Sequence, residues 1–278
     1  MDEFSGQSED LENQVAALLQ DIYRKFRLDY RNYSPSFLGR RTVAFAKTHD
    51  IKTFDALAKK LLSDETALEL FVASLSLPTT RMFRDEEVFK QIRASVIPYL
   101  AKTQLDKVWC AGCSTGEEAY SLAIILNEEL EDRKVLTFAT DFSERSLHKA
   151  EKGIYSLRRM RAYTSSYMAA GGRSDFSDYY SSDDENAIMN AQLKRSIVFA
   201  QHNLVTDSTF NEFDLILCRN VLIYFNKQLQ EHVLSLLFQS LRPGGILVLG
   251  DKESLRTMIS RQNFAEVDRS LRIYRRSG

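Results

Sequence analysis

V-W-C-A-G-C-S-T-G-E-E-A-Y-S-L-A, residues 108–123, is the stretch that decides the fold. It begins with a short apolar run, turns at glycines 112 and 116, and continues as an amphipathic run from Glu117. A strand, a glycine turn and the start of a helix form the unit with which α/β proteins hold nucleotides. The stretch therefore predicts an open α/β sheet with a ligand crevice beside the glycine turn.

A second stretch, C-R-N-V-L-I-Y-F at residues 218–225, is expected to form the opposite wall of the same pocket. The apolar run 213–218 ends abruptly in Arg219 and Asn220, shortly before Tyr224. Polar residues at the carboxyl end of a buried strand point into the ligand crevice of an open sheet. We therefore expect these residues to line the site.

The composition is that of an ordinary globular protein. The 278 residues, 44% hydrophobic and 27% charged, suffice for one large domain or two modest ones. A net charge of −1 gives no global basic field that would favour nucleic acid. No apolar run approaches the roughly eighteen residues of a membrane span, and the acidic start lacks the features of a signal peptide. We expect a cytoplasmic protein.

The chain divides into two predicted domains. Apolar residues recur at helical spacing over 11–46, 54–62 and 65–74, and Pro78 then disfavours further helix, so we place the boundary between 77 and 78. From residue 86 helices and strands alternate, which is typical of a parallel sheet. The expected helices are 86–101, 117–130, 143–152 and 227–241; the expected strands are 107–111, 135–140, 197–200, 213–218, 246–249 and 271–274.

Residues 163–192 interrupt this alternation. They are rich in serine, glycine and acidic residues, and they predict a loop or a small hairpin inserted into the domain 78–278.

The glycine turn contains neither G-x-G-x-x-G nor a glycine followed by lysine, so it does not predict a phosphate cradle. Glycine at 112 lets the backbone approach a small ligand that lacks a pyrophosphate, and we count Gly112 among the cofactor-binding residues. The other interpretation is a tight strand-to-helix turn.

Two acidic residues have both a binding and a structural interpretation. Asp141 directly follows a predicted strand, where a carboxylate accepts hydrogen bonds from ribose hydroxyls, but it also suits a helix cap. Glu118 is a candidate cofactor ligand, while Thr115-x-x-Glu118 is also a capping-box pattern.

Other enzyme classes are disfavoured. Residues 112–116 satisfy G-x-S-x-G, the nucleophile elbow of hydrolases, but the upstream chain reads helical and contains no H-G-G-G-like segment. Cys110-x-x-Cys113 resembles a redox motif or half of a metal site, but Cys218 and the scattered histidines provide no second ligand pair. We expect reduced thiols and no metal.

Several motifs in order resemble those of the CheR family of chemotaxis receptor methyltransferases. They are T-T-R-M-F-R-D (79–85), A-G-C-S-T-G-E-E-A-Y-S-L-A (111–123), A-T-D (139–141), C-R-N-V-L-I-Y-F (218–225) and L-R-P-G-G (241–245). The resemblance runs from about residue 11 to the end. It implies an all-α N-terminal domain, 1–77, followed by a Rossmann-like methyltransferase domain, 78–278, with a mostly parallel seven-stranded sheet and a small inserted subdomain.

The resemblance also implies an activity. Members of the family transfer a methyl group from S-adenosylmethionine to glutamate side chains on the cytoplasmic helices of chemoreceptors. The residues whose motif positions imply cofactor contact are Thr80, Arg84, Glu118, Asp141, Asn203, Leu204, Arg219 and Asn220. Arg84 and Tyr224 are the residues we expect to orient the incoming carboxylate. Arg84 alternatively clamps the cofactor carboxylate, and Tyr224 alternatively is a packed aromatic.

The sequence departs from the family pattern at three places. Gly250-Asp251-Lys252-Glu253-Ser254 stands where the family commonly has G-H-S-E, and Met82 replaces a phenylalanine. The insert 163–192 corresponds to a small β-subdomain that grips a receptor tail peptide in some members, but its strand pattern here is weak.

A basic cluster predicts a docking surface in the N-terminal domain. With Asp29 the segment carries a net charge of +5, contributed by Arg24, Lys25, Arg27, Arg31, Arg40 and Arg41. It suits an acidic partner helix, or else it is simply a solvated face. Two other functions stay open: a methyltransferase of this fold with a different carboxylate acceptor, and a non-catalytic module that senses the cofactor.

Overall fold

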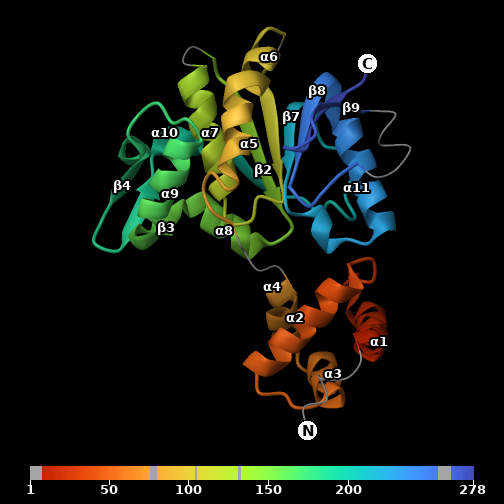
Figure 1. The fold of residues 1–278 in the computed structure, drawn as a ribbon. Helices are drawn as coiled ribbons and strands as arrows, with labels where there is room; N and C mark the ends of the chain where they lie inside the picture. The colour runs from red at the N-terminus through yellow and green to blue at the C-terminus, as the bar shows by residue number, and fades with distance from the viewer. Residues whose placement is uncertain (1–7, 76–79, 104, 131–132, 256–263) are drawn as a thin grey trace. The chain divides into compact units, whose positions relative to one another are not determined.

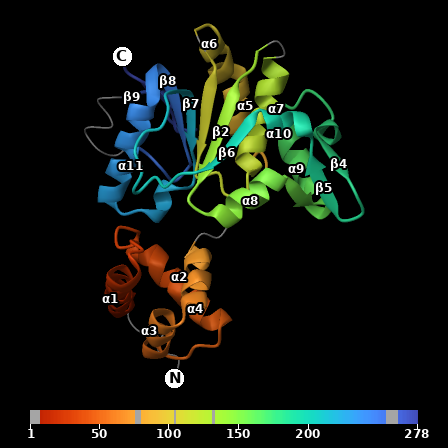
Figure 2. The same ribbon diagram turned by 180° about the vertical axis from the view of Figure 1, so that it is seen from behind.

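The computed structural model describes residues 8–75, 80–103, 105–130, 133–255 and 264–278. It divides into two compact units, one of residues 1–77 with 223–230 and one of residues 78–222 with 231–278. Figure 1 and Figure 2 show the helical first unit in red and orange and the sheet-containing second unit in yellow to blue.

The first unit is helical, as its apolar periodicity predicts. Its helices are α1 (Ser8–Phe26), α2 (Pro35–Thr48), α3 (Phe54–Ser63) and α4 (Glu65–Leu75). The periodic pattern over 11–46 is broken between α1 and α2, where Arg27 has a positive φ of 62° and Pro35 opens the next helix. Leu57 and Leu61 of α3 are fully buried in the core of this unit.

The second unit contains a seven-stranded sheet of order β6-β2-β1-β7-β8-β10-β9. Its strands are β1 (Lys107–Ala111), β2 (Leu136–Asp141), β6 (Ile197–Gln201), β7 (Phe213–Cys218), β8 (Leu241–Leu249), β9 (Phe264–Asp268) and β10 (Ile273–Arg276). The five strands from β6 to β8 pair in parallel, whereas β10 is antiparallel to both of its neighbours. The Rossmann-like fold class is thereby confirmed.

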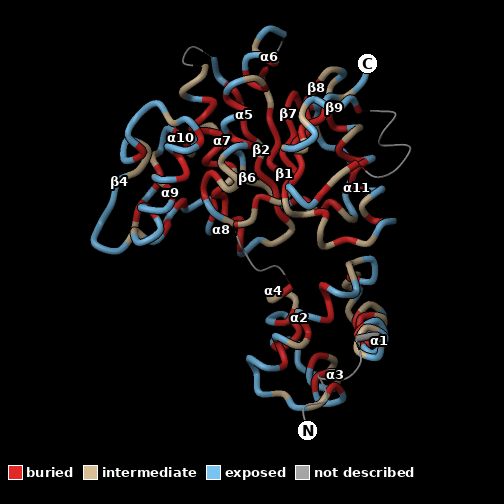
Figure 3. Tube along the Cα trace, viewed as in Figure 1, coloured by how far each residue is buried: buried red, intermediate tan, exposed pale blue. Residues whose placement is uncertain are grey.

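Helices join and flank these strands. They are α5 (Glu86–Gln91), the π-helical turn η2 (Ile92–Val96), α6 (Ile97–Ala101), α7 (Glu117–Glu129), α8 (Glu144–Lys152), α9 (Leu157–Ala169), α10 (Ala191–Arg195) and α11 (Lys227–Ser240). Figure 1 and Figure 2 both place α11 beside β7 and β8. Figure 3 shows that buried residues concentrate in the central strands, and β7 is buried along its whole length.

The insert is more ordered than the sequence predicts. The expected loop over 163–192 is wrong for its first part, because α9 continues to Ala169. The remainder contains η3 (Phe176–Tyr179), β4 (Tyr180–Ser182) and β5 (Asn186–Met189), and these strands form with β3 (Ile154–Ser156) a second sheet of order β3-β5-β4. Its polar composition hid a helix whose buried side is aromatic, with Tyr163 and Tyr167 packed into the main core.

Several strands also differ from expectation. β2 and β6 are each shifted or extended by one residue. The late strand lies at 273–276 instead of 271–274, and β9 was not anticipated because only Phe264 of its residues is buried. The stop at residues 242–245 ends α11 as expected, but β8 already begins at Leu241. A register shift against β7 accommodates the extra residues.

A buried polar network fastens the insert to the main domain through Glu128 of α7. Its carboxylate lies 2.5 Å from Arg93 of η2 and accepts hydrogen bonds from the hydroxyls of Tyr167 and Tyr179. The side chains of Glu128 and Arg93 are only 6% and 7% exposed. Arg93 also pairs with Glu129 at 2.7 Å, so loss of Glu128 would leave the guanidinium one carboxylate and would remove the acceptor of the two tyrosine hydroxyls. Leaving buried polar groups without a partner is destabilising.

We expect Glu128→Ala to lower the free energy of unfolding by about 1 to 3 kcal/mol, because Glu129 still pairs with Arg93. Asp184→Ala, at an exposed acidic residue of the same insert, is the matched control and should change it by less than about 0.5 kcal/mol. Urea denaturation of both variants measures this. Equal stabilities of the two variants would contradict the role of Glu128.

The same contrast has a defined pH dependence. Burial raises the pKa of Glu128, but hydrogen bonds from Tyr167, Tyr179 and Arg93 outweigh it, so the pKa is lowered from its ordinary value of 4.5. The ionised carboxylate therefore contributes its full stability above pH 4.5, and this is lost as the pH falls through the lowered value. The difference between wild type and Glu128→Ala should shrink over that acidic range.

Candidate functional site

The site is built at the carboxyl ends of β1, β2, β7 and β8. The glycine turn after β1 is tied to the end of β2, because the amides of Gly112 and Cys113 both donate to the Thr140 carbonyl at 2.8 Å. Gly112 has a φ of +75°, and a Cβ at this position would lie 2.5 Å from Cγ2 of Val221. Glycine is therefore required there, where the loop after β7 meets the glycine turn.

Asp141 organises both the glycine turn and the start of α8. Its carboxylate accepts a hydrogen bond from the Ser114 amide at 2.9 Å and from the Ser143 amide at 3.0 Å. The cap of α8 is Ser143, whose side chain accepts from the Ser146 amide, so Asp141 supports the cap rather than forming it. A carboxylate has about four lone-pair sites, which leaves capacity for a further donor.

Burial raises the pKa of Asp141 from its ordinary value of 3.8, and the backbone donors Ser143 and Ser114 offset only part of this shift. The residue is 9% exposed and lies at the end of β2. A desolvated carboxylate at this position suits donors such as ribose hydroxyls.

Glu118 forms an ion pair instead of a capping box. Thr115 donates its hydroxyl to Glu117 at 2.6 Å, and Gly116 is the N-cap of α7 without a side-chain bond. Glu118 accepts from Nη1 of Arg219 at 3.1 Å. The capping-box interpretation of Glu118 is therefore wrong, because the neighbouring glutamate takes the threonine.

Arg219 joins three segments of the second unit. Besides Glu118, its Nη2 donates to Asp85 Oδ2 at 2.6 Å and to the Arg84 carbonyl at 3.1 Å. Its side chain is 1% exposed, and Nε is buried without a hydrogen-bond partner. Burial raises the pKa of Glu118 from 4.5, and the attraction of Arg219 offsets only part of this effect.

Asn203 and Leu204, two of the predicted cofactor contacts, follow β6. The amide of His202 donates to the Asp141 carbonyl at 3.2 Å, which brings Asn203 and buried Leu204 next to the end of β2. The side-chain oxygen of Asn203 accepts from the Val205 amide at 2.9 Å and so shapes its own turn.

The remaining predicted residues are placed as follows. Thr80 is half-buried at the start of a described segment. Nε of Arg84 lies 3.9 Å from Asp85, and its side chain is 32% exposed. Tyr224 belongs to the first compact unit, where its ring centroid lies 4.7 Å from that of Phe37. This contact matches the packed-aromatic alternative, while a role in catalysis stays a prediction for both Arg84 and Tyr224.

Sequence reasoning missed Glu253. This residue is 4% exposed, and its carboxylate accepts from the amides of Asn220, Val221 and Gly250. The available signal was a carboxylate a few residues after a buried strand. The sequence departs from the family pattern at Asp251 and Lys252, just before Glu253, but the side chains of these two residues are exposed.

The structure gives little support to the hydrolase, redox and metal-site interpretations. Ser114 does have the positive φ of 52° that an elbow serine would have, but the described hydrogen bonds include none between Ser114 and a histidine. Cys110, Cys113 and Cys218 are free and buried, and burial raises the thiol pKa of each well above its ordinary value of 9.0. Within the described ranges no group of three or more acidic, histidine or cysteine residues is arranged to hold a metal ion.

The carboxylates and the glycine turn of the site fit S-adenosylmethionine as a ligand. Asp141 offers acceptor capacity to ribose hydroxyls, and the glycine turn admits close approach without the features that hold a pyrophosphate. The carboxylates of Asp85, Glu118 and Asp141 outnumber the arginines that pair with them, which suits a ligand with positive charge better than a phosphate.

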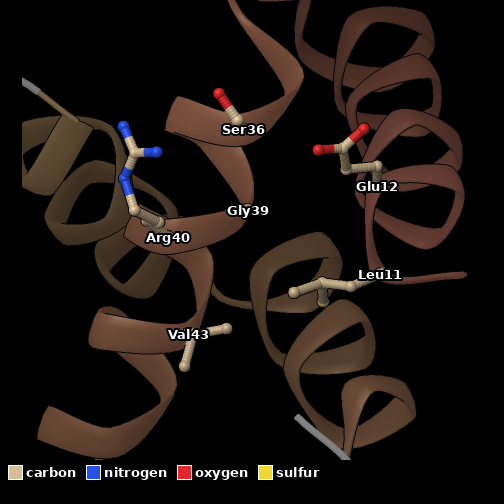
Figure 4. Close-up of a pocket in the computed structure, with 6 residues that line it drawn as sticks. All are labelled: Leu11, Glu12, Ser36, Gly39, Arg40 and Val43. Carbon is tan, nitrogen blue, oxygen red and sulfur yellow. The ribbon is translucent and has the colours of Figure 1, made fainter. Parts of the chain in front are cut away.

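A separate hollow of about 310 Å³ lies in the helical unit between α1 and α2 (Figure 4). Leu11 and Glu12 contribute from α1, and Ser36, Gly39, Arg40 and Val43 from α2.

In the basic cluster, Arg31 is paired with Asp29 at 2.6 Å and Lys25 donates to the Leu62 carbonyl at 2.7 Å. Part of its charge is thus already engaged within the unit. None of the helices over the described ranges is both long and apolar enough to cross a membrane.

A Rossmann-like sheet with this glycine turn and these carboxylate acceptors fits the class of S-adenosylmethionine-dependent methyltransferases. Two family models match: the SAM binding domain of CheR methyltransferase over residues 78–271, and its all-alpha domain over residues 13–76. The chain belongs to the CheR methyltransferase family. S-Adenosylmethionine as cofactor and the family resemblance are thereby confirmed.

The chain is similar to several curated proteins along most of its length. It is 42% identical over 264 residues to Cher3 of Pseudomonas putida, covering 95% of this chain and 97% of that one. It is 30% identical over 248 residues to a chemotaxis protein methyltransferase of Listeria monocytogenes, covering 88% and 92%. A chemotaxis protein methyltransferase 1 of Vibrio cholerae is 33% identical over 206 residues, covering 67% and 70%.

We expect Asp141→Ala to weaken S-adenosylhomocysteine binding roughly 30-fold, because two ribose hydrogen bonds of about 1 kcal/mol each are lost. Calorimetric titration measures the affinity, and Asp251→Ala, an exposed acid of the same unit, is the control. Unchanged affinity in Asp141→Ala would restrict this residue to organising the glycine turn and α8.

Proposed function

We propose that this protein methylates glutamate side-chain carboxylates of chemoreceptors in the cytoplasm, with residues 1–77 as a docking domain and 78–278 as the catalytic domain. The observation that carries the proposal is the match of both CheR domain models in one chain. The Listeria and Vibrio relatives named chemotaxis protein methyltransferases support it further.

The chemistry needs no general base from the protein. When bound, S-adenosylmethionine supplies a sulfonium methyl group. A carboxylate oxygen would form a bond to the methyl carbon while the bond from that carbon to sulfur breaks, giving a methyl ester, with S-adenosylhomocysteine as the leaving group. A glutamate with a pKa near 4.3 is already ionised at neutral pH. The protein's task is therefore to bind, orient and exclude water.

Distinct residues carry these tasks in our proposal. Asp141 and Glu118 hold the cofactor, Arg219 holds Glu118 in place, and Asn203, Leu204 and Asn220 surround the cofactor together with Thr80 and Gly112. Arg84 and Tyr224 orient the incoming carboxylate, by a charge-assisted hydrogen bond and a hydroxyl donor respectively.

The direct test is transfer of a labelled methyl group to a cytoplasmic chemoreceptor fragment, with the product identified by release of methanol in mild base. Base-labile label on glutamate supports the proposal. Binding of the cofactor with no transfer to receptor or cell extract would favour a non-catalytic sensing module instead.

Tyr224→Phe should lower receptor methylation about 10- to 100-fold while leaving the affinity for S-adenosylhomocysteine nearly unchanged, because only a hydroxyl donor is lost. Tyr33→Phe is a matched control, since Tyr33 also contacts an aromatic ring of the first unit, Phe225. A collapse of cofactor affinity in Tyr224→Phe would make Tyr224 a packing residue.

The basic cluster is our proposed receptor-docking surface, through Arg24, Lys25, Arg27 and Arg31. Reversing Arg27 and Arg31 to glutamate should raise the KM for receptor several-fold, more strongly at low salt, without changing cofactor affinity. Lys59→Glu with Lys60→Glu reverses two exposed charges elsewhere in the helical unit as a control. An unaltered receptor KM would identify the cluster as a solvated face.

A second candidate is a methyltransferase of this family with a carboxylate acceptor on another protein. The 42% identical relative, Cher3, is named without reference to chemotaxis. A tritium-transfer screen against cell extract separates the two, because a labelled band other than a chemoreceptor would identify the alternative acceptor.

A further inference from the structure

One buried carboxylate ties together the chain ends of two strands that form the site. Oε2 of Glu253 accepts from the amides of Asn220 at 3.0 Å and Gly250 at 2.6 Å, and Oε1 accepts from the amide of Val221 at 2.8 Å. Asn220 and Val221 follow β7, whereas Gly250 follows β8. Hydrogen bonds to a charged acceptor are stronger than neutral ones, and this carboxylate is almost fully removed from water.

The backbone after β7 and β8 leaves the strand pairing, so its amides need acceptors from elsewhere. Asn220 has a φ of +60°, a left-handed conformation that asparagine adopts more readily than most residues with a side chain. A Cβ on Gly250 would lie 2.7 Å from Oε2 of Glu253 and 2.8 Å from the Asn220 nitrogen. Glu253 thus stabilises this part of the backbone by accepting hydrogen bonds from amides that lie beyond the ends of β7 and β8.

The junction in turn sets two walls of the site. Val221 lies against Gly112, where a Cβ would approach its Cγ2 to 2.5 Å. Arg219, directly before Asn220, reaches Glu118 and Asp85 with its guanidinium. A shift of the 219–221 backbone would therefore move both the glycine-turn contact and the Arg219 ion pairs.

We propose that Glu253 is a positioning residue of the methyl-transfer site, which fixes the 219–221 backbone against the glycine turn without touching the reacting groups. This inference rests on the proposed function of the site. Glutamine cannot replace the glutamate at this position. Its amide group would set an N–H donor against one of the three backbone N–H donors, so Glu253→Gln removes part of the interaction at nearly unchanged side-chain size.

The test compares Glu253→Gln with Glu266→Gln, a matched change at an exposed glutamate on β9. Without any ligand, hydrogen exchange at the amides of Asn220 and Val221 should accelerate about tenfold or more in Glu253→Gln, while the amides of β1 keep their protection. Affinity for S-adenosylhomocysteine should fall tenfold or more. Fluorescence of Trp109, the single tryptophan, checks that the fold is retained.

Each outcome decides the proposal. Exchange and affinity equal to wild type would overturn it, and so would a uniform loss of protection across β1, which would indicate a general structural role. If Glu253→Gln does not fold, Glu253→Asp, which keeps the charge but shortens the reach, should give the same localised exchange. Failure of the wild type to bind S-adenosylhomocysteine would instead count against the proposed function, and the ligand-free exchange still tests Glu253.

Discussion

The arrangement of this site depends on the buried guanidinium of Arg219. A charged group with 1% exposure is tolerated only when it is paired and hydrogen-bonded, and Arg219 meets this condition through Glu118, Asp85 and the Arg84 carbonyl. These partners come from α7 and from the segment before α5. One side chain after β7 therefore fixes the positions of two other elements that carry predicted cofactor contacts.

Two carboxylates, those of Asp141 and Glu253, hold neighbouring parts of the backbone by accepting hydrogen bonds from amides. Asp141 holds the Ser114 and Ser143 amides, and Glu253 holds amides after β7 and β8. Glu118 and Asp141 have raised pKa values because burial desolvates them. The site is thus rich in carboxylates that hold backbone positions, which is consistent with a cofactor that carries a positive charge at its reacting centre.

Much of the fold followed from local sequence signals. The apolar runs of β1 and β7 and the glycine turn between β1 and α7 were placed correctly, because strands buried on both faces leave a continuous apolar pattern. The helix α9 was missed because its sequence is rich in arginine and serine, and its buried side consists of Met160, Tyr163, Ser166 and Tyr167. β9 was missed because most of its residues are exposed at the sheet edge.

Within the site, the sequence did not predict which residues form hydrogen bonds or ring contacts with one another. Thr115 and Glu118 fit a capping box by spacing, yet Thr115 bonds Glu117, since Glu118 is drawn to Arg219 about a hundred positions later in the chain. Glu253 stands at the glutamate of the family's G-H-S-E pattern, but that pattern does not indicate which backbone amides it binds, and the sequence around Tyr224 does not indicate that its ring contacts Phe37. These are long-range pairings, which no local pattern encodes.

The most direct test of the central claim is calorimetric titration of the wild-type protein with S-adenosylmethionine, S-adenosylhomocysteine and, as a control, NAD. We expect both sulfur compounds to bind and NAD not to bind, because the glycine turn lacks the features that hold a pyrophosphate. Binding of NAD, or no binding of either sulfur compound, would contradict the assignment of this group of carboxylates and the glycine turn as a methyltransferase site.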